Sequence, residues 1–170
     1  MFKRRVFFMW LVCIGIIVGF AGNSFAEWGN KELETEKTAV NFAKETDRGG
    51  YKIVSTEELK EWIDQKKDML IVDTMPYEDS YKKQHIPGAV QYEFSKEEVT
   101  NLDDKAKAAF EKVIGPNKAR LIVIYCGFTK CGRSHNGAMW AVKLGYKNVY
   151  RYAGGIKAWT EADYPVEKIK

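Results

Sequence analysis

The run Leu121–Tyr125, which leads directly into Cys126, constrains the fold of this chain more than any other stretch. It holds five apolar or aromatic residues, mostly β-branched, and such a run is typical of a strand that is buried on both faces. A short loop with two glycines follows. Ser134 is then predicted to be the N-cap of a helix, because apolar residues recur after it at near-helical spacing. A strand buried on both faces needs helices on each side, so this stretch predicts an α/β fold.

The rest of the chain repeats this alternation of strand and helix patterns. Further strands are predicted at residues 51–54, 69–73, 90–92 and 148–152. Helices are predicted to begin at two capping boxes, residues 55–58 and 95–98, the second leading a helical pattern up to Gly115. A short helix is predicted at residues 77–84. The order predicts a single domain with a mainly parallel sheet that helices cover on both faces.

Cys126 is the candidate reactive residue in this arrangement. Ligands of open parallel sheets bind beyond the carboxyl ends of the strands, where Asp73 and Cys126 are both predicted to lie. Backbone N–H groups and a helix N-terminus there favour an anion, so the Cys126 thiol is predicted to lose its proton easily. The basic residues Lys130 and Arg133 on the loop favour an anionic ligand as well. The alternative is that Cys126 is only a small buried apolar residue.

The first 26 residues are predicted to be a secretory signal peptide. Three basic residues at positions 3–5 precede an uncharged apolar run, and Ser24-Phe25-Ala26 is typical of a cleavage site before Glu27. The alternative is an uncleaved segment that anchors the domain to a membrane. Cleavage predicts export to the periplasm or beyond, an oxidising compartment. It also removes three basic residues and no acid, so the formal charge falls from +4 to +1, which gives no reason to expect nucleic-acid binding.

Residues 27–50 form a polar lead-in before the domain at residues 51–170. Sparse apolar residues in the lead-in predict a helix over about residues 32–46, stopped by Gly49 and Gly50. The pattern does not decide whether this helix packs on the domain or is loose.

Several motifs together resemble one known family. They are Leu70-Ile-Val-Asp73, Tyr77-Glu-Asp-Ser-Tyr81, His85-Ile-Pro-Gly-Ala89, Ile122-Val-Ile-Tyr-Cys126 and Tyr152-Ala-Gly-Gly-Ile-Lys-Ala-Trp159. In order and spacing they resemble the rhodanese (sulfurtransferase) domain family, and the resemblance covers most of the chain after residue 52. It implies a five-stranded, mainly parallel sheet with helices on both faces.

The resemblance also implies a chemistry. The family's nucleophile maps to Cys126, which would carry a sulfane sulfur from thiosulfate, polysulfide or a persulfide donor to a thiol or protein acceptor through a cysteine persulfide. No metal or organic cofactor is implied. The loop after the nucleophile would bind the small sulfur anion, and its residues are Gly127, Phe128, Thr129, Lys130, Gly132, Arg133 and Ser134.

The loop departs from the family's usual pattern. The family places an arginine five residues after the nucleophile, where this chain has Cys131, and Arg133 stands seven residues after Cys126. Phosphatases and arsenate reductases of the same fold use Cys-x5-Arg, whereas this chain reads Cys-x6-Arg, which favours sulfur transfer over those reactions. Cys131 is a candidate resolving thiol, disulfide partner or plain loop residue. The alternative functions are therefore a non-catalytic rhodanese-like binding module and a dithiol redox protein.

The remaining candidates are interpreted as structural. Asp73 is predicted to orient nearby backbone N–H groups, and His85 to hold a turn. His135 is predicted to be an exposed residue in the first turn of its helix. Three tryptophans are predicted to belong to the core, namely Trp62, Trp140 and Trp159.

Overall fold

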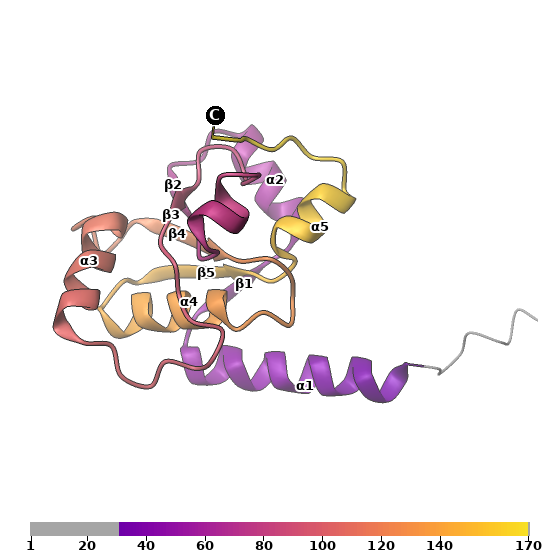
Figure 1. The fold of residues 1–170 in the computed structure, drawn as a ribbon, viewed down its shortest axis with the longest axis horizontal. Helices are drawn as coiled ribbons and strands as arrows, with labels where there is room; N and C mark the ends of the chain where they lie inside the picture. The colour runs from indigo at the N-terminus through magenta and orange to yellow at the C-terminus, as the bar shows by residue number, and fades with distance from the viewer. Residues whose placement is uncertain (1–30, 170) are drawn as a thin grey trace, which may run out of the picture.

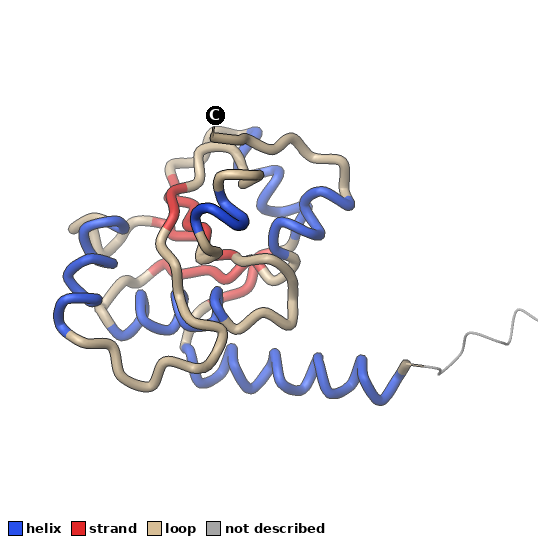
Figure 2. Tube along the Cα trace, in the orientation of Figure 1, coloured by secondary structure: helices blue, strands red, loops and turns tan. Residues whose placement is uncertain are grey.

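The computed structural model describes residues 31–169, which form one parallel five-stranded sheet with helices on both faces. The strands are β1 (Lys52–Val54), β2 (Met69–Asp73), β3 (Val90–Gln91), β4 (Leu121–Tyr125) and β5 (Asn148–Tyr152). Their order in the sheet is β1-β5-β4-β2-β3, so β4 is central, and Figure 2 shows the sheet enclosed by helices. The α/β, rhodanese-like fold expected from the sequence is confirmed, and the sheet is parallel throughout.

The helices form two layers (Figure 1). One layer holds α2 (Thr56–Asp64), α5 (Gly155–Glu161) and a π-helical turn, η1 (Tyr77–Tyr81). The other holds α1 (Glu32–Gly49), α3 (Asp104–Ile114) and α4 (Arg133–Lys143). Each face of the sheet has its own apolar cluster, around Phe110 and Ile124 on the α3–α4 side and around Leu59 and Trp159 on the α2–α5 side. Trp140 and Trp159 are buried, as predicted, and Trp62 is partly buried.

The strands follow the sequence pattern closely. β2, β4 and β5 have the predicted bounds, β1 begins one residue later than predicted, and β3 ends one residue earlier. The capping box of α2 is present in full, with Ser55 and Glu58 bonded reciprocally. Asp73 pairs with Tyr125 in the register of β2 and β4, which brings Asp73 and Cys126 to the same edge of the sheet.

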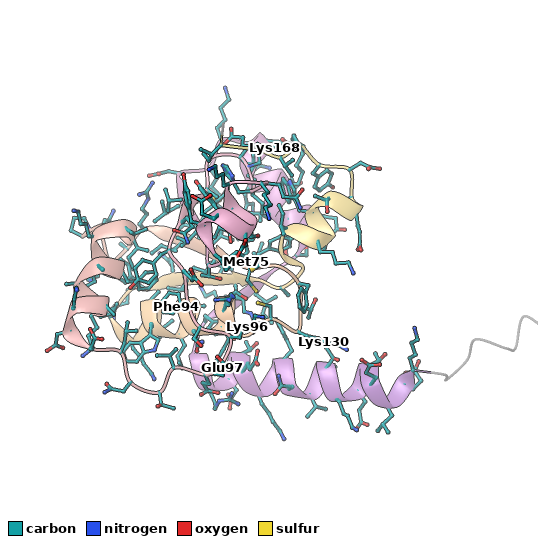
Figure 3. The ribbon with its side chains drawn as sticks, in the orientation of Figure 1. Met75, Phe94, Lys96, Glu97, Lys130 and Lys168 are labelled. Carbon is teal, nitrogen blue, oxygen red and sulfur yellow. The ribbon has the colours of Figure 1, made fainter. Side chains whose placement is uncertain are left out.

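The predicted helix start at residues 95–98 is wrong. The α3 helix begins only at Asp104, where the side chain of Asp103 accepts a hydrogen bond from the Ala106 N–H. The segment before it runs across the start of α4 instead, and Figure 3 shows Phe94, Lys96 and Glu97 along its course. Asn136 of α4 holds this segment by donating to the carbonyls of residues 95 and 97 and accepting from the N–H of residue 99. These bonds to a distant side chain replace the local capping box.

The prediction that Ser134 is an N-cap is also wrong. The α4 helix begins at Arg133 after the N-cap Gly132, so Ser134 lies within the first turn. A Cβ at residue 132 would lie only 2.3 Å from the carbonyl oxygen of Lys96, so the chain passes this point because Gly132 has no side chain. The hydroxyl of Ser134 therefore does not cap α4 and instead contacts Cys126 in the loop of residues 126–132, which we call the sulfur loop.

The lead-in helix α1 packs on the domain, which answers the question that the sequence left open. It runs to Gly49, three residues past the predicted end, and Gly50 closes it in the left-handed conformation with φ 64°. Its C-terminal half lies against α4. Arg48 of α1 also forms an ion pair at 2.6 Å with Glu98, which lies in the segment before α3. Within residues 31–169 no helix has the length and apolar character that a membrane span requires. The predicted signal peptide, residues 1–26, lies outside the described residues.

Candidate active site around Cys126

Cys126 follows the central strand β4 directly and its side chain is 1% exposed. Its Sγ lies 3.1 Å from the Ser134 hydroxyl oxygen and 3.3 Å from the carbonyl oxygen of Cys131, with a second carbonyl, that of Phe128, at 3.8 Å. Burial raises the pKa of Cys126 well above its ordinary value. The predicted easy loss of the Cys126 proton therefore does not hold in this closed loop, because carbonyl groups and apolar surroundings favour the neutral thiol.

Cys131 is the second thiol of the loop, 7% exposed and, like Cys126, not in a disulfide. The neighbouring Cys126 thiol lowers the pKa of Cys131 to about 6, assisted by the backbone N–H groups of Arg133 and Gly127. Backbone N–H groups, expected from the sequence to lower the pKa of Cys126, thus lower that of Cys131, and for Cys126 the N–H of Ser134 does not offset burial. The ionisation of each thiol therefore depends on the other, with the pKa of Cys126 raised and that of Cys131 lowered.

The end of β4 is fastened from the other side by the start of α5. The Ile156 N–H donates to the carbonyl oxygen of Cys126 at 2.9 Å, and the Lys157 N–H donates to that of Gly127 at 3.0 Å. Gly155 makes this possible, since it has φ +63° and a Cβ there would lie 2.4 Å from the carbonyl oxygen of Cys126.

Arg151 of β5 is a site residue that sequence reasoning missed. Its side chain is 1% exposed, and its guanidinium donates to the Ser134 hydroxyl at 2.9 Å and to the Cys131 carbonyl at 3.1 Å. It also pairs with Glu45 of α1 at 2.5 Å. The available signal was an arginine between two tyrosines inside a predicted buried strand, because a buried charge requires partners.

Comparison with known proteins identifies the family. The family model described as a rhodanese-like domain matches residues 55–162, most of the described chain. This chain belongs to the rhodanese-like domain family. No curated protein matches the sequence.

Several solved structures superpose on this rhodanese-like domain and share its fold. Thiosulfate sulfurtransferase from Pseudomonas aeruginosa superposes with a TM-score of 0.59 at 19% identity, covering 78% of this chain and 23% of that one. A structural-genomics protein from Bacillus halodurans gives 0.55 at 20% identity, with 79% and 86% covered. A protein of unknown function from Rhodopseudomonas palustris, described as a possible tyrosine phosphatase, gives 0.55 at 21%, with 74% and 93% covered. At these identities the likeness establishes the fold.

The two basic residues predicted to bind an anion have protein partners in this rhodanese-like domain. Lys130 lies between the loop and α1, where it forms an ion pair with Glu34, and its side chain is 54% exposed (Figure 3). Arg133 donates to the carbonyl oxygen of Phe94 and lies 3.3 Å from the Glu93 carboxylate. The charge of Arg133 still lowers the pKa of Cys131.

The remaining loop residues lie where the sequence predicted, between β4 and α4. Phe128, Thr129 and Lys130 form the exposed outer part of the loop, and Cys126 and Gly127 are buried beneath it. Phe128, Thr129 and Lys130 also line one wall of a cleft of about 880 Å³ between α1 and α5. Phe42 of α1 and Gly154, before α5, belong to its other walls. The cleft is therefore adjacent to the sulfur loop, although Cys126 itself is closed off from solvent.

Asp73 and the two histidines complete the surroundings. Asp73 Oδ1 accepts from the Met75 N–H at 2.9 Å, the expected backbone role, and burial raises the pKa of Asp73 to about 6. His85 stacks on Tyr81 with ring centroids 4.0 Å apart and holds its turn, as predicted. The prediction that His135 is exposed is wrong, since it is 2% exposed and its Nδ1 lies 2.8 Å from the Tyr51 hydroxyl. The ring of Tyr51, two residues after the end of α1, lies edge-on to it with ring centroids 5.7 Å apart.

Proposed function

We propose that this rhodanese-like domain is a sulfurtransferase in which Cys126 carries a sulfane sulfur as a persulfide. The observation that carries the proposal is the position of Cys126. It is a buried thiol at the carboxyl end of the central strand, beside the first turn of a helix and under a loop that α5 fastens. This is the place at which the family holds its nucleophile. The name of the Pseudomonas aeruginosa structure supports thiosulfate as one donor to test.

The proposed reaction has two balanced steps. The Cys126 thiolate attacks the outer sulfur of thiosulfate, a new S–S bond forms, and sulfite leaves with the electron pair of the old bond. A polysulfide donor reacts in the same way and leaves as a shortened polysulfide. An acceptor thiolate then attacks the terminal sulfur of the persulfide, and the Cys126 thiolate is released as the leaving group.

The thiol pair supplies the proton chemistry for the first step. Cys131 is the more readily ionised of the two thiols. A Cys131 thiolate can accept the Cys126 proton, at a free-energy cost because the pKa of Cys131 lies below that of Cys126, and Cys126 then attacks as the thiolate. The loop must move for a donor to reach a sulfur that is 1% exposed.

Intact-mass measurement after incubation with thiosulfate or polysulfide tests the proposal. The protein should gain one sulfur atom, located on Cys126 by peptide mapping. Cys126→Ser should keep the fold, because the two side chains are close in size, and should lose both the mass gain and sulfur transfer to an acceptor. Persulfide formation that survives in Cys126→Ser and disappears in Cys131→Ser would reverse the assignment.

A dithiol redox role is the second candidate, favoured by two free thiols on one short loop that shift each other's pKa. Oxidation would join Cys126 and Cys131, passing two electrons and two protons to a disulfide oxidant or a peroxide. A Cys131 thiolate could also attack a Cys126 persulfide, forming the same disulfide and releasing sulfide. Cys131→Ser should then keep the persulfide longer and resist inactivation by mild oxidation. Thiol counting on both proteins checks this, and unchanged thiols and activity in oxidised wild type would argue against it.

We also propose that the domain is exported by cleavage before Glu27, as the first 26 residues suggest. In an oxidising compartment Cys126 and Cys131 could be either free thiols or a disulfide, depending on the redox conditions there. N-terminal sequencing of the protein from the cell envelope should find Glu27 first, whereas a chain that starts at Met1 would indicate a membrane anchor.

A further inference from the structure

The guanidinium of Arg151 donates hydrogen bonds through all three of its nitrogens, two of them to the loop after Cys126 and the start of α4 and one to Glu45 and Tyr51. Nε donates to the Ser134 hydroxyl oxygen at 2.9 Å, and one terminal nitrogen donates to the Cys131 and Thr129 carbonyls at 3.1 and 3.4 Å. The other terminal nitrogen donates to Glu45 at 2.5 Å and to the Tyr51 hydroxyl at 3.1 Å. An arginine has five N–H donors, so this arrangement gives each one a partner.

The contact with Ser134 has a chemical consequence for Cys126. A guanidinium can only donate, so the Ser134 oxygen accepts from Arg151, and the hydroxyl proton of Ser134 must point elsewhere. The sulfur of Cys126 lies 3.1 Å from that oxygen. When Cys126 is a thiolate or a persulfide anion, Ser134 therefore donates to its sulfur, and the positive charge of Arg151 strengthens this bond.

The contact with the Cys131 carbonyl acts in the same direction. This carbonyl oxygen lies 3.3 Å from the Cys126 sulfur, and its partial negative charge opposes ionisation of that sulfur. Arg151 donates to the same oxygen at 3.1 Å and so reduces the repulsion. One side chain thus supplies a directed donor and weakens an opposing acceptor.

We propose that Arg151 is a positioning residue for sulfur transfer, acting through Ser134 and the Cys131 carbonyl to stabilise negative charge on the sulfur of Cys126. The inference deepens the proposed function and rests on Cys126 as the sulfur-carrying thiol. It also gives α1 a part in the site. Glu45 and the Phe42 ring, 4.5 Å from the guanidinium carbon, hold Arg151 from a helix that precedes the residues matched by the family model.

The pH dependence of Cys126 alkylation by iodoacetamide tests the inference without any sulfur donor. The full chain is used in a Cys131→Ala background, and peptide mass spectrometry reads Cys126 separately from Cys13. The other titratable or charged groups packed around the loop are kept in every variant, namely Glu45 of α1, Asp73 of β2, Tyr51 before β1, Lys130 on the loop, and Arg133 and His135 of α4.

Arg151→Gln should raise the midpoint pH of alkylation by about one unit or more, which is about tenfold slower alkylation below the midpoint. Ser134→Ala removes only the hydroxyl and should shift the midpoint in the same direction. The double variant should shift it by less than the sum of the two, because Arg151 acts partly through Ser134. Arg151→Lys keeps the charge but not the fork of donors, so it should resemble Arg151→Gln.

Arg48→Gln is the matched control, because it removes a positive charge from the exposed ion pair of α1 and should leave the midpoint unchanged. An unshifted midpoint in folded Arg151→Gln, or full rescue by lysine, would overturn the inference. If Arg151→Gln does not fold, an unshifted midpoint in Ser134→Ala overturns it as well. If wild type forms no persulfide while the variants still shift the midpoint pH of alkylation, the proposed function is rejected, and the effect of Arg151 on the ionisation of Cys126 still stands.

Discussion

At the scale of single residues, Asp73 is the buried carboxylate whose ionisation opposes folding. Its side chain is 0% exposed, and its Oδ2 has no hydrogen-bond partner among the described residues. Folding raises its pKa from 3.8 to about 6. The folded state therefore binds a proton that the unfolded state releases, so stability is lost as pH rises from 3.8 to about 6, and the loss is complete above that.

Asp73→Asn should stabilise the domain at neutral pH, because it removes this penalty and keeps an oxygen for the Met75 N–H. The expected gain is about 1–3 kcal/mol at pH 7 and should shrink as the pH falls through 6 towards 3.8. Urea unfolding at pH 7 and 4.5 measures it. Asp103→Asn, at the exposed N-cap of α3, is the control and should be nearly neutral at both pH values. A gain of equal size at both values would show that the charge of Asp73 is not the cause.

At the scale of elements, the junction between β4 and α5 determines the shape of the sulfur loop. Gly155 has φ +63°, and an added Cβ would lie 2.4 Å from the Cys126 carbonyl oxygen. Gly155→Ala should therefore lose about 3 kcal/mol or more, from a left-handed backbone and from an overlap that displaces the loop. Sulfur transfer should fall with it, because the carbonyl that moves belongs to Cys126, the proposed nucleophile.

Gly145→Ala separates the two causes. Gly145 has φ +90° but no atom within 4 Å of an added Cβ, so this variant should lose only about 1–2 kcal/mol and keep its activity. Denaturant midpoints and sulfur-transfer rates of the two variants make the comparison. Equal losses in both would mean that backbone conformation alone accounts for Gly155.

At the scale of the whole molecule, α1 is joined to the domain through the site itself. Glu45 pairs with the buried Arg151, and Lys130 of the loop pairs with Glu34. Deleting residues 1–50 should lower the free energy of unfolding by about 2–4 kcal/mol relative to deleting residues 1–30, because it leaves a buried guanidinium without its carboxylate. Urea unfolding of the two truncated chains measures the difference. The same stability in both would make α1 an accessory that the domain does not need.

The strands and the position of Cys126 in the fold could be predicted from the sequence because their signals are local. Runs of aliphatic residues placed β2 and β4 to the residue, and a short run with valine and two tyrosines placed β5. The Ser55–Glu58 capping box formed because its partners are only three residues apart. The position of Cys126 followed from the end of β4, and the strand order put Asp73 beside it.

Only the tertiary structure decided what surrounds the sulfur. The capping signals at Ser95 and Ser134 failed because contacts with distant residues override them. Asn136 donates to the Ser95 carbonyl across 41 residues, and Arg151 donates to the Ser134 hydroxyl across 17. His135 is buried beside Tyr51, 84 residues away in the chain, which no local pattern near His135 could indicate. Arg151 meets Glu45 across 106 residues, and the charge of a buried arginine is satisfied only when the sheet, the loop and α1 are brought together by the fold.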